Sequence, residues 1–243
     1  MKLKSIQASA IKNLFEVLKD IINDVNIYFT SEGIKIIAFD IARVTLVHVF
    51  MAAENFEEYE CAHDTTVGIN ILNIFKLIKS IRSNDVLTME VRDENLFISV
   101  QNDSKKSTSN FSVKLLDLNE DELEIPEITM RYQTSISSVD FQKLVRDMAN
   151  IGSDMTITRT GNQIIFKSEG DFASQETNIE QTETVPEDAQ GLFKLKYLSM
   201  FTKGTILCSI VQILQNPEPD SPIVFQYTIA NLGDIKFYLA PST

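Results

Sequence analysis

The sequence is poor in the residues from which metal sites and disulfide frameworks are built. Its 243 residues include two cysteines, Cys61 and Cys208, and two histidines, His48 and His63. The cysteines lie far apart and have no CxxC partner, which argues against a disulfide framework or a zinc site and suits a reducing compartment. We expect both thiols to be buried, and His48, which lies in an apolar run, to be a strand residue without a catalytic role.

The chain also lacks the motifs of common enzyme and membrane classes. Neither GxGxxG nor GxxxxGK[ST] occurs, so nucleotide binding through these loops has no support. No stretch reaches the roughly 18 consecutive apolar residues of a membrane helix, and residues 1–6 lack the apolar core of a signal peptide. No catalytic carboxylate pair stands out among the acidic residues. We therefore expect an intracellular protein that needs no cofactor or metal and is not an enzyme.

What the sequence does contain is an internal duplication. Apolar residues recur at helical spacing in residues 11–21 and, with the same offsets, in residues 141–151. A β-hairpin pattern around a glycine follows each helix, in residues 26–37 and 154–165. A second helix and further strands then follow in both halves, and residues 95–100 and 235–240 are expected to close the two copies. Four elements in the same order indicate a repeated domain.

The predicted fold class is α+β, with two copies of one domain in residues 1–114 and 131–243. Residues 115–130 form an acidic, leucine-bearing run with a proline, which is typical of a linker. Residues 101–110 and 171–191 are polar and lack apolar periodicity, so we expect surface loops or edge strands there.

The positive charge of the chain is concentrated on its predicted helices. The formal net charge is −12, yet residues 9–22, 70–82, 141–151 and 194–203 together carry +7, which leaves −19 for the rest. Same-face spacing places the helix cations away from the apolar stripes, where they could neutralise phosphates without reading bases. For any one helix an ordinary solvated face is the alternative. The cations are Lys12, Lys19, Lys76, Lys79, Lys143, Arg146, Lys196 and Lys203.

Several stretches of the chain resemble the proliferating cell nuclear antigen family of DNA sliding clamps, and in the family's order. They are residues 18–23 (Leu-Lys-Asp-Ile-Ile-Asn), 114–118 (Lys-Leu-Leu-Asp-Leu), 125–127 (Ile-Pro-Glu), 198–203 (Leu-Ser-Met-Phe-Thr-Lys) and 229–241. The resemblance covers nearly the whole chain. It implies a homotrimeric ring of six similar clamp domains, in which helices line the hole and antiparallel sheets form the outer wall.

The resemblance also implies partners and site residues. The partners are double-stranded DNA, bound without sequence specificity, a DNA polymerase, a clamp loader and other proteins with clamp-interacting peptides, in replication and repair. The cellular location that the resemblance implies is the nucleus, or the replication site of a virus inside its host cell. The eight helix cations above are implied as DNA contacts. The implied peptide pocket consists of Arg43, Val44, Leu46, Leu123, Ile125, Pro222, Tyr238, Leu239, Ala240 and Pro241.

The implied subunit joint pairs an edge strand at residues 109–116 with one at residues 172–180 of a neighbouring copy. Two departures from the family concern partner choice: Arg43 stands where a histidine is usual, and Glu124 replaces a glycine. Two other functions remain open at this point. One is a processivity factor that lies on DNA without encircling it, and the other is a checkpoint-type clamp subunit that joins unlike partners.

Overall fold

The structure is a computed structural model that describes residues 1–243 except 41, 103, 119–122, 124–127, 219 and 243. Its contacts divide the chain into two compact units. The first unit comprises Met1–Ile41, Val47–Glu124 and Thr228–Ile235, and the second comprises Ala42–Leu46, Ile125–Tyr227 and Lys236–Thr243. Each unit therefore includes a short segment from the other half of the sequence.

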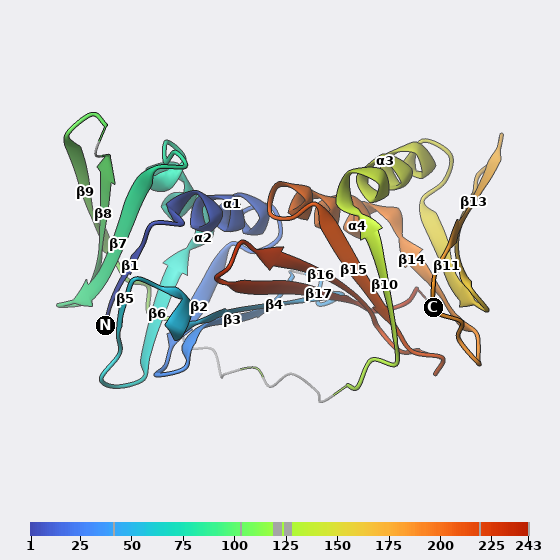
Figure 1. The fold of residues 1–243 in the computed structure, drawn as a ribbon, viewed down its shortest axis with the longest axis horizontal. Helices are drawn as coiled ribbons and strands as arrows, with labels where there is room; N and C mark the ends of the chain where they lie inside the picture. The colour runs from blue at the N-terminus through green and yellow to red at the C-terminus, as the bar shows by residue number, and fades with distance from the viewer. Residues whose placement is uncertain (41, 103, 119–122, 124–127, 219, 243) are drawn as a thin grey trace. The chain divides into compact units, whose positions relative to one another are not determined.

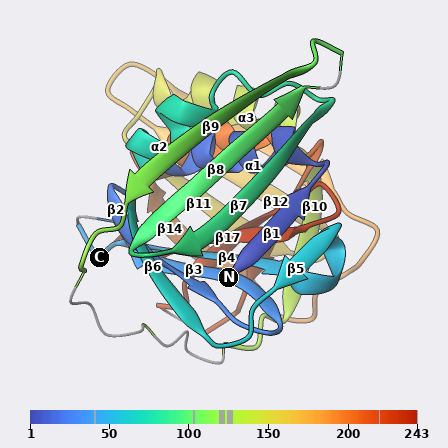
Figure 2. The same ribbon diagram turned by 90° about the vertical axis from the view of Figure 1, so that its left-hand side faces the viewer.

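The first unit contains helices α1 and α2, the short 3-10 helix η1 and a run of antiparallel strands (Figure 1). One sheet has the order β5-β1-β7-β8-β9, so β5 and β9 are its edges, as Figure 2 shows, and a second group has the order β4-β3-β2-β6. The bounds are β1 Lys2–Ser5, α1 Ala8–Leu18, β2 Asp24–Phe29, β3 Gly33–Phe39, β4 Thr45–Ala52, η1 Ala53–Asn55, β5 Glu58–Glu60, β6 Thr65–Asn70, α2 Ile71–Ile78, β7 Asp85–Arg92, β8 Asn95–Asn102 and β9 Ser107–Lys114.

Local sequence explains the elements of this unit. Helix α1 buries Ile11, Leu14, Phe15 and Leu18 on one face, as an amphipathic helix does. Helix α2 begins after Asn70, whose side chain accepts a hydrogen bond from the main-chain N–H of Asn73 at 2.9 Å. The turn between β2 and β3 requires Gly33, because a Cβ there would lie 2.1 Å from the carbonyl oxygen of Met51.

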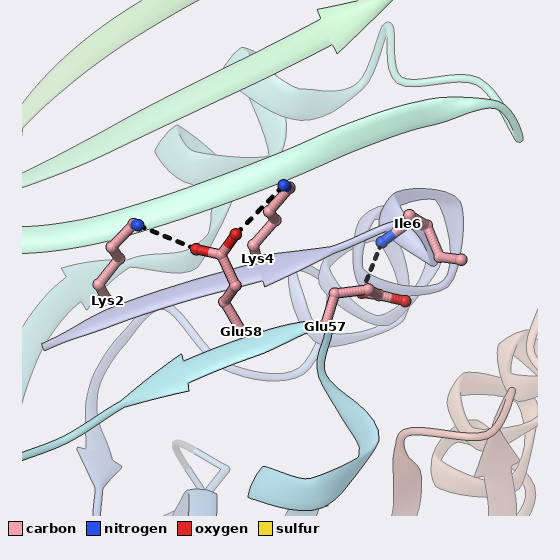
Figure 3. Close-up of polar contacts among 5 residues, drawn as sticks. All are labelled: Lys2, Lys4, Ile6, Glu57 and Glu58. Carbon is pink, nitrogen blue, oxygen red and sulfur yellow. Dashed lines mark hydrogen bonds and ion pairs between the residues drawn. The ribbon is translucent and has the colours of Figure 1, made fainter.

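A group of charged side chains joins the short edge strand β5 to β1 (Figure 3). The Nζ atoms of Lys2 and Lys4 lie 2.9 and 3.2 Å from the two carboxylate oxygens of Glu58, and Glu57 accepts the main-chain N–H of Ile6. The hydrogen bond with Glu58 raises the pKa of Lys2, and bonds from both lysines lower the pKa of Glu58. Such exposed pairs add little stability, but charges on an edge strand discourage unwanted strand pairing.

The second unit repeats the arrangement with helices α3 and α4 and the short 3-10 helix η2 (Figure 1). One sheet has the order β13-β12-β11-β14, and a second group has the order β10-β15-β16-β17. The bounds are β10 Tyr132–Ser137, α3 Ser138–Ala149, β11 Asp154–Thr160, β12 Gln163–Glu169, β13 Ser174–Glu180, β14 Ala189–Lys194, α4 Leu195–Phe201, η2 Thr202–Ile206, β15 Ile210–Gln215, β16 Ile223–Ile229 and β17 Gly233–Leu239.

Aromatic side chains fill the core of the second unit. The ring of Phe201 in α4 stacks on that of Phe237 in β17, with centroids 4.7 Å apart, and the ring of Phe141 in α3 stacks on that of Phe225 in β16 at 5.3 Å. These contacts place both helices on one face of the sheet. The alternate residues of the strands therefore point to the opposite, helix-free face.

The predicted order of helix, strands, helix, strands is present in both halves of the chain. The predicted hairpins correspond to β2–β3 and β11–β12, and the polar segments include the edge strands β9 and β13. One predicted correspondence is wrong. Three strands follow the second helix in each half, so the counterpart of β17 is β9, whereas β8, at residues 95–102, corresponds to β16.

Cys61 and Cys208 are half-buried, so the expectation that both thiols are buried is wrong. Among the described residues, none of the helices has the length and apolar character needed to cross a bilayer. The described residues also include no group of three or more His, Cys, Asp or Glu side chains that could hold a metal ion.

Candidate DNA-binding helices and peptide pocket

In the first unit, helices α1 and α2 pack against each other, and the expected lysines lie on or just after these two helices. The Nζ atom of Lys19, just after α1, lies 5.3 Å from the ring centroid of Phe75 in α2 and 3.1 Å from the carboxylate of Asp20. Lys76 and Lys79 are exposed at the end of α2, and Lys12 is half-buried on α1. The structure thus places all four expected cations of this unit on one helix pair.

The second unit has the same organisation. The side chain of Gln142 in α3 donates a hydrogen bond to the main-chain carbonyl of Thr202 at 3.2 Å, which joins α3 to the segment that carries Lys203. Lys143, Arg146, Lys196 and Lys203 are all exposed. Arg146 lies 3.8 Å from Asp147, and the ammonium of Lys196 lies 4.6 Å from the ring centroid of Tyr197.

These helix pairs have the chemistry of a phosphate-contacting surface. Within the described part of the chain, Lys12, Lys76, Lys79 and Lys143 make no ion pair, so their charges are available to an external anion. Arg82, exposed after α2, adds a cation that the residue predictions omitted, although it contributes to the charge of residues 70–82. Long cationic side chains on helices bind phosphates without reading base sequence.

Several of the expected pocket residues lie in the second unit, around the end of β17. The main-chain N–H of Ala240 donates to the carbonyl of Val44 at 3.3 Å, which fixes these two distant segments side by side. Tyr238, between the buried Phe237 and Leu239, points to the helix-free face. Val44, Pro222 and Pro241 are half-buried, while Arg43 and Ala240 are exposed.

The remaining members of the expected pocket have different positions. Leu239 is 1% exposed and Leu46 is 7% exposed, so their side chains belong to the core and do not line a surface pocket. Leu123 is half-buried and belongs to the first unit. Ile125 lies outside the described residues. Arg43 has a φ of 55°, a conformation uncommon for a residue with a side chain.

A separate apolar cavity lies beside the edge strand β13. Its volume is about 230 Å³. Its apolar lining comes from Ile136, Phe141, Leu144 and Ile179, and Asp140, Lys143, Asp147 and Thr177 complete it. Thr177 and Ile179 are alternate residues of β13, so they point to the same side of the strand. The cavity is large enough to receive an aromatic side chain from outside the unit.

Two units, each with antiparallel strands behind a cation-bearing helix pair, define the class of DNA clamps. Residues 1–123 match the family model "Proliferating cell nuclear antigen, N-terminal domain", and residues 124–242 match "Proliferating cell nuclear antigen, C-terminal domain". The "Probable DNA polymerase sliding clamp 1" of Paramecium bursaria Chlorella virus 1 is 34% identical over 252 residues, which cover 98% of this chain and 95% of that protein.

The chain therefore belongs to the proliferating cell nuclear antigen family of DNA sliding clamps, as the sequence stretches predicted. This family consists of non-enzymatic processivity factors that bind DNA and polymerase partners and form a trimeric ring. The viral source of the similar clamp fits DNA replication inside a host cell.

Proposed function

We propose that three copies of this chain close into a ring around duplex DNA and tether a polymerase during replication and repair, in the nucleus or at a viral replication site. The observation that carries this proposal is the concentration of exposed cations on both helix pairs of a chain whose net charge is −12. Helices that face a central hole would meet phosphates, while acidic outer surfaces would not adhere to nucleic acid.

The proposed DNA contacts are the eight helix cations, four in each unit. The proposed clamp domains are residues 1–114 and 131–243, and residues 115–130 connect them. Because phosphates are the same at every base pair, a ring held by such contacts can slide along DNA.

The subunit joint follows from the duplication. Strands β4 and β17 pair within the chain: Ala52 donates to Leu232 at 3.0 Å in the first unit, and Ala240 donates to Val44 in the second. Their counterparts in the duplication are β13 and β9, which are both sheet edges. We propose that β9 of one copy pairs with β13 of the next, and that this head-to-tail contact closes the ring.

An apolar anchor supports this joint. Phe111 is the only aromatic residue of the largely polar strand β9, and it lies opposite the buried Ile98 of β8, on the core side of the sheet. The cavity beside β13 offers an apolar site at the complementary edge. We propose that Phe111 of one copy enters the cavity of its neighbour.

A topological experiment tests ring function without a clamp loader. The protein is incubated with linear duplex DNA whose ends carry biotin, and streptavidin is added either before or after the protein. We expect retention through gel filtration only when the ends are blocked after the protein has threaded. Equal retention in both orders would show binding without encirclement and would favour a non-encircling processivity factor.

We also propose that the pocket at the end of β17 captures partner peptides with an aliphatic and aromatic plug. Val44, Pro222, Tyr238 and Pro241 would line it, with the buried Leu46 and Leu239 behind; Leu123 and Ile125 stay expectations from the family resemblance. The exposed Arg43 at its rim would favour peptides with an acidic flank.

Replacing Tyr238 with alanine tests the pocket. Truncation of an aromatic contact at such a site typically costs about 1 to 3 kcal/mol, so the peptide Kd should rise roughly 5- to 150-fold. The measurement is calorimetric titration of a glutamine-aliphatic-aromatic peptide into both proteins. Tyr132→Ala removes another half-buried tyrosine from the same unit and serves as the control. Equal affinities of the wild type and the Tyr238 variant would place the pocket elsewhere.

A further inference from the structure

The chain after β17 crosses from the proposed pocket to a second edge strand. Strand β14 lies at the edge of the sheet β13-β12-β11-β14, opposite β13. The main-chain N–H of Ser242 donates to the carbonyl of Leu192 in this strand at 2.7 Å. Residues 240–242 therefore bond to Val44 at one end and to Leu192 at the other, and Leu192 lies next to the Pro241 end of the pocket.

The side chain of Leu192, like that of Tyr238, points to the helix-free face of its sheet. It is 41% exposed, whereas the next residue, Phe193, is 2% exposed. Since successive side chains of a strand alternate, Leu192 stands on the helix-free face, where it lies opposite Thr156 of β11. An exposed leucine here offers apolar area beside a site that already captures apolar side chains under our proposal.

The main chain of β14 also has hydrogen-bonding groups directed outward. In an antiparallel strand the N–H and C=O of one residue point to the same side, and this side alternates along the strand. The bond from Ser242 shows that Leu192 turns its main chain away from β11, and Gln190 then does so as well. An extended peptide can form main-chain hydrogen bonds with such groups at a sheet edge.

We infer that Leu192 is a specificity-determining contact for partner peptides. It receives an apolar side chain from the peptide flank that extends beyond the plug. The outward main-chain groups of Gln190 and the N–H of Leu192, whose carbonyl already accepts from Ser242, bond the backbone of this flank. The inference rests on the proposed peptide pocket and adds a contact that selects among peptides with the same plug.

Three synthetic peptides test this contact by calorimetric titration against the full-length protein. All contain the same glutamine-aliphatic-aromatic plug. The first has only glycine and serine flanks, the second has leucines before the plug, and the third has leucines after it. The variant Leu192→Ser is compared with Leu72→Ser, because Leu72, on α2, is 42% exposed and gives a matched loss of an exposed leucine.

We expect one leucine-flanked peptide to bind the wild type and Leu72→Ser about five-fold more tightly than the plain peptide. Leu192→Ser should abolish this gain and leave the affinity of the plain peptide unchanged. If all three peptides bind equally, or if the gain survives in Leu192→Ser, the inference is wrong while the pocket stands. If no peptide binds the wild type, the pocket and the inference both fail.

Discussion

Replacing Phe111 with alanine is expected to convert a trimer of about 82 kDa, three times the 27.5 kDa of the chain, into monomers at micromolar concentration. The two edge strands are rich in serine, threonine and asparagine, so main-chain pairing there has little apolar support. Loss of one buried aromatic anchor costs about 2 to 4 kcal/mol at an interface, and the proposed ring has three such joints. Pairing of the polar edge strands alone is not expected to offset this loss of binding free energy, so the trimer should dissociate.

Light scattering coupled to gel filtration measures the masses directly. Phe97→Ala is the matched control, because Phe97 lies on the adjacent strand β8, opposite Ser112 and on the other face from Phe111, with the guanidinium of Arg92 4.4 Å from its ring centroid. This variant should remain trimeric. A trimeric Phe111→Ala variant would show that the anchor lies elsewhere, and a monomeric wild type would overturn the closed ring.

Charge reversal on helix α2 should weaken DNA binding strongly without affecting assembly. Lys76→Glu combined with Lys79→Glu alters six side chains in a trimer, all on helices proposed to face the hole. Each phosphate contact contributes a slope of roughly 0.9 to the dependence of log K on log salt concentration. We expect the Kd for linear duplex DNA to rise about ten-fold or more at physiological salt, with a shallower salt dependence.

Fluorescence anisotropy over a series of salt concentrations gives both quantities. The control is Lys105→Glu with Lys106→Glu, which changes the charge equally at the exposed turn between β8 and β9 in the same unit. The trimer mass of both variants is checked first. Unchanged DNA affinity in the α2 variant would identify Lys76 and Lys79 as ordinary solvated side chains.

The elements with strong local patterns could be predicted from the sequence. Helix α1 and helix α3 have apolar residues at helical spacing, and the hairpins β2–β3 and β11–β12 alternate around a glycine. The excess of positive charge on the helices could also be predicted, because it follows from the positions of the charged residues in the sequence. In the structure these helices pack with their apolar residues buried, and they carry the cations, as both patterns predict.

Other elements lack a local pattern for physical reasons. Strand β16 (Ile223–Ile229) is buried along most of its length, so its side chains do not alternate between apolar and polar. Strand β9 is exposed along most of its length and reads as a polar loop. The pocket depends on the pairing of Val44 with Ala240, nearly 200 residues apart, which no local spacing indicates. Its residues came from the family resemblance, and Leu192 was not among them.

The division of strands β4 and β17 between the two units has a consequence for biosynthesis. The first unit includes Thr228–Ile235, so it lacks part of its structure until the ribosome has passed residue 235. The second unit in turn needs Ala42–Leu46, which is made early. Domains commonly fold one after another as they emerge during translation. In this chain the first unit cannot be completed before most of the second has been synthesised, and it must wait, partly formed, for residues 228–235.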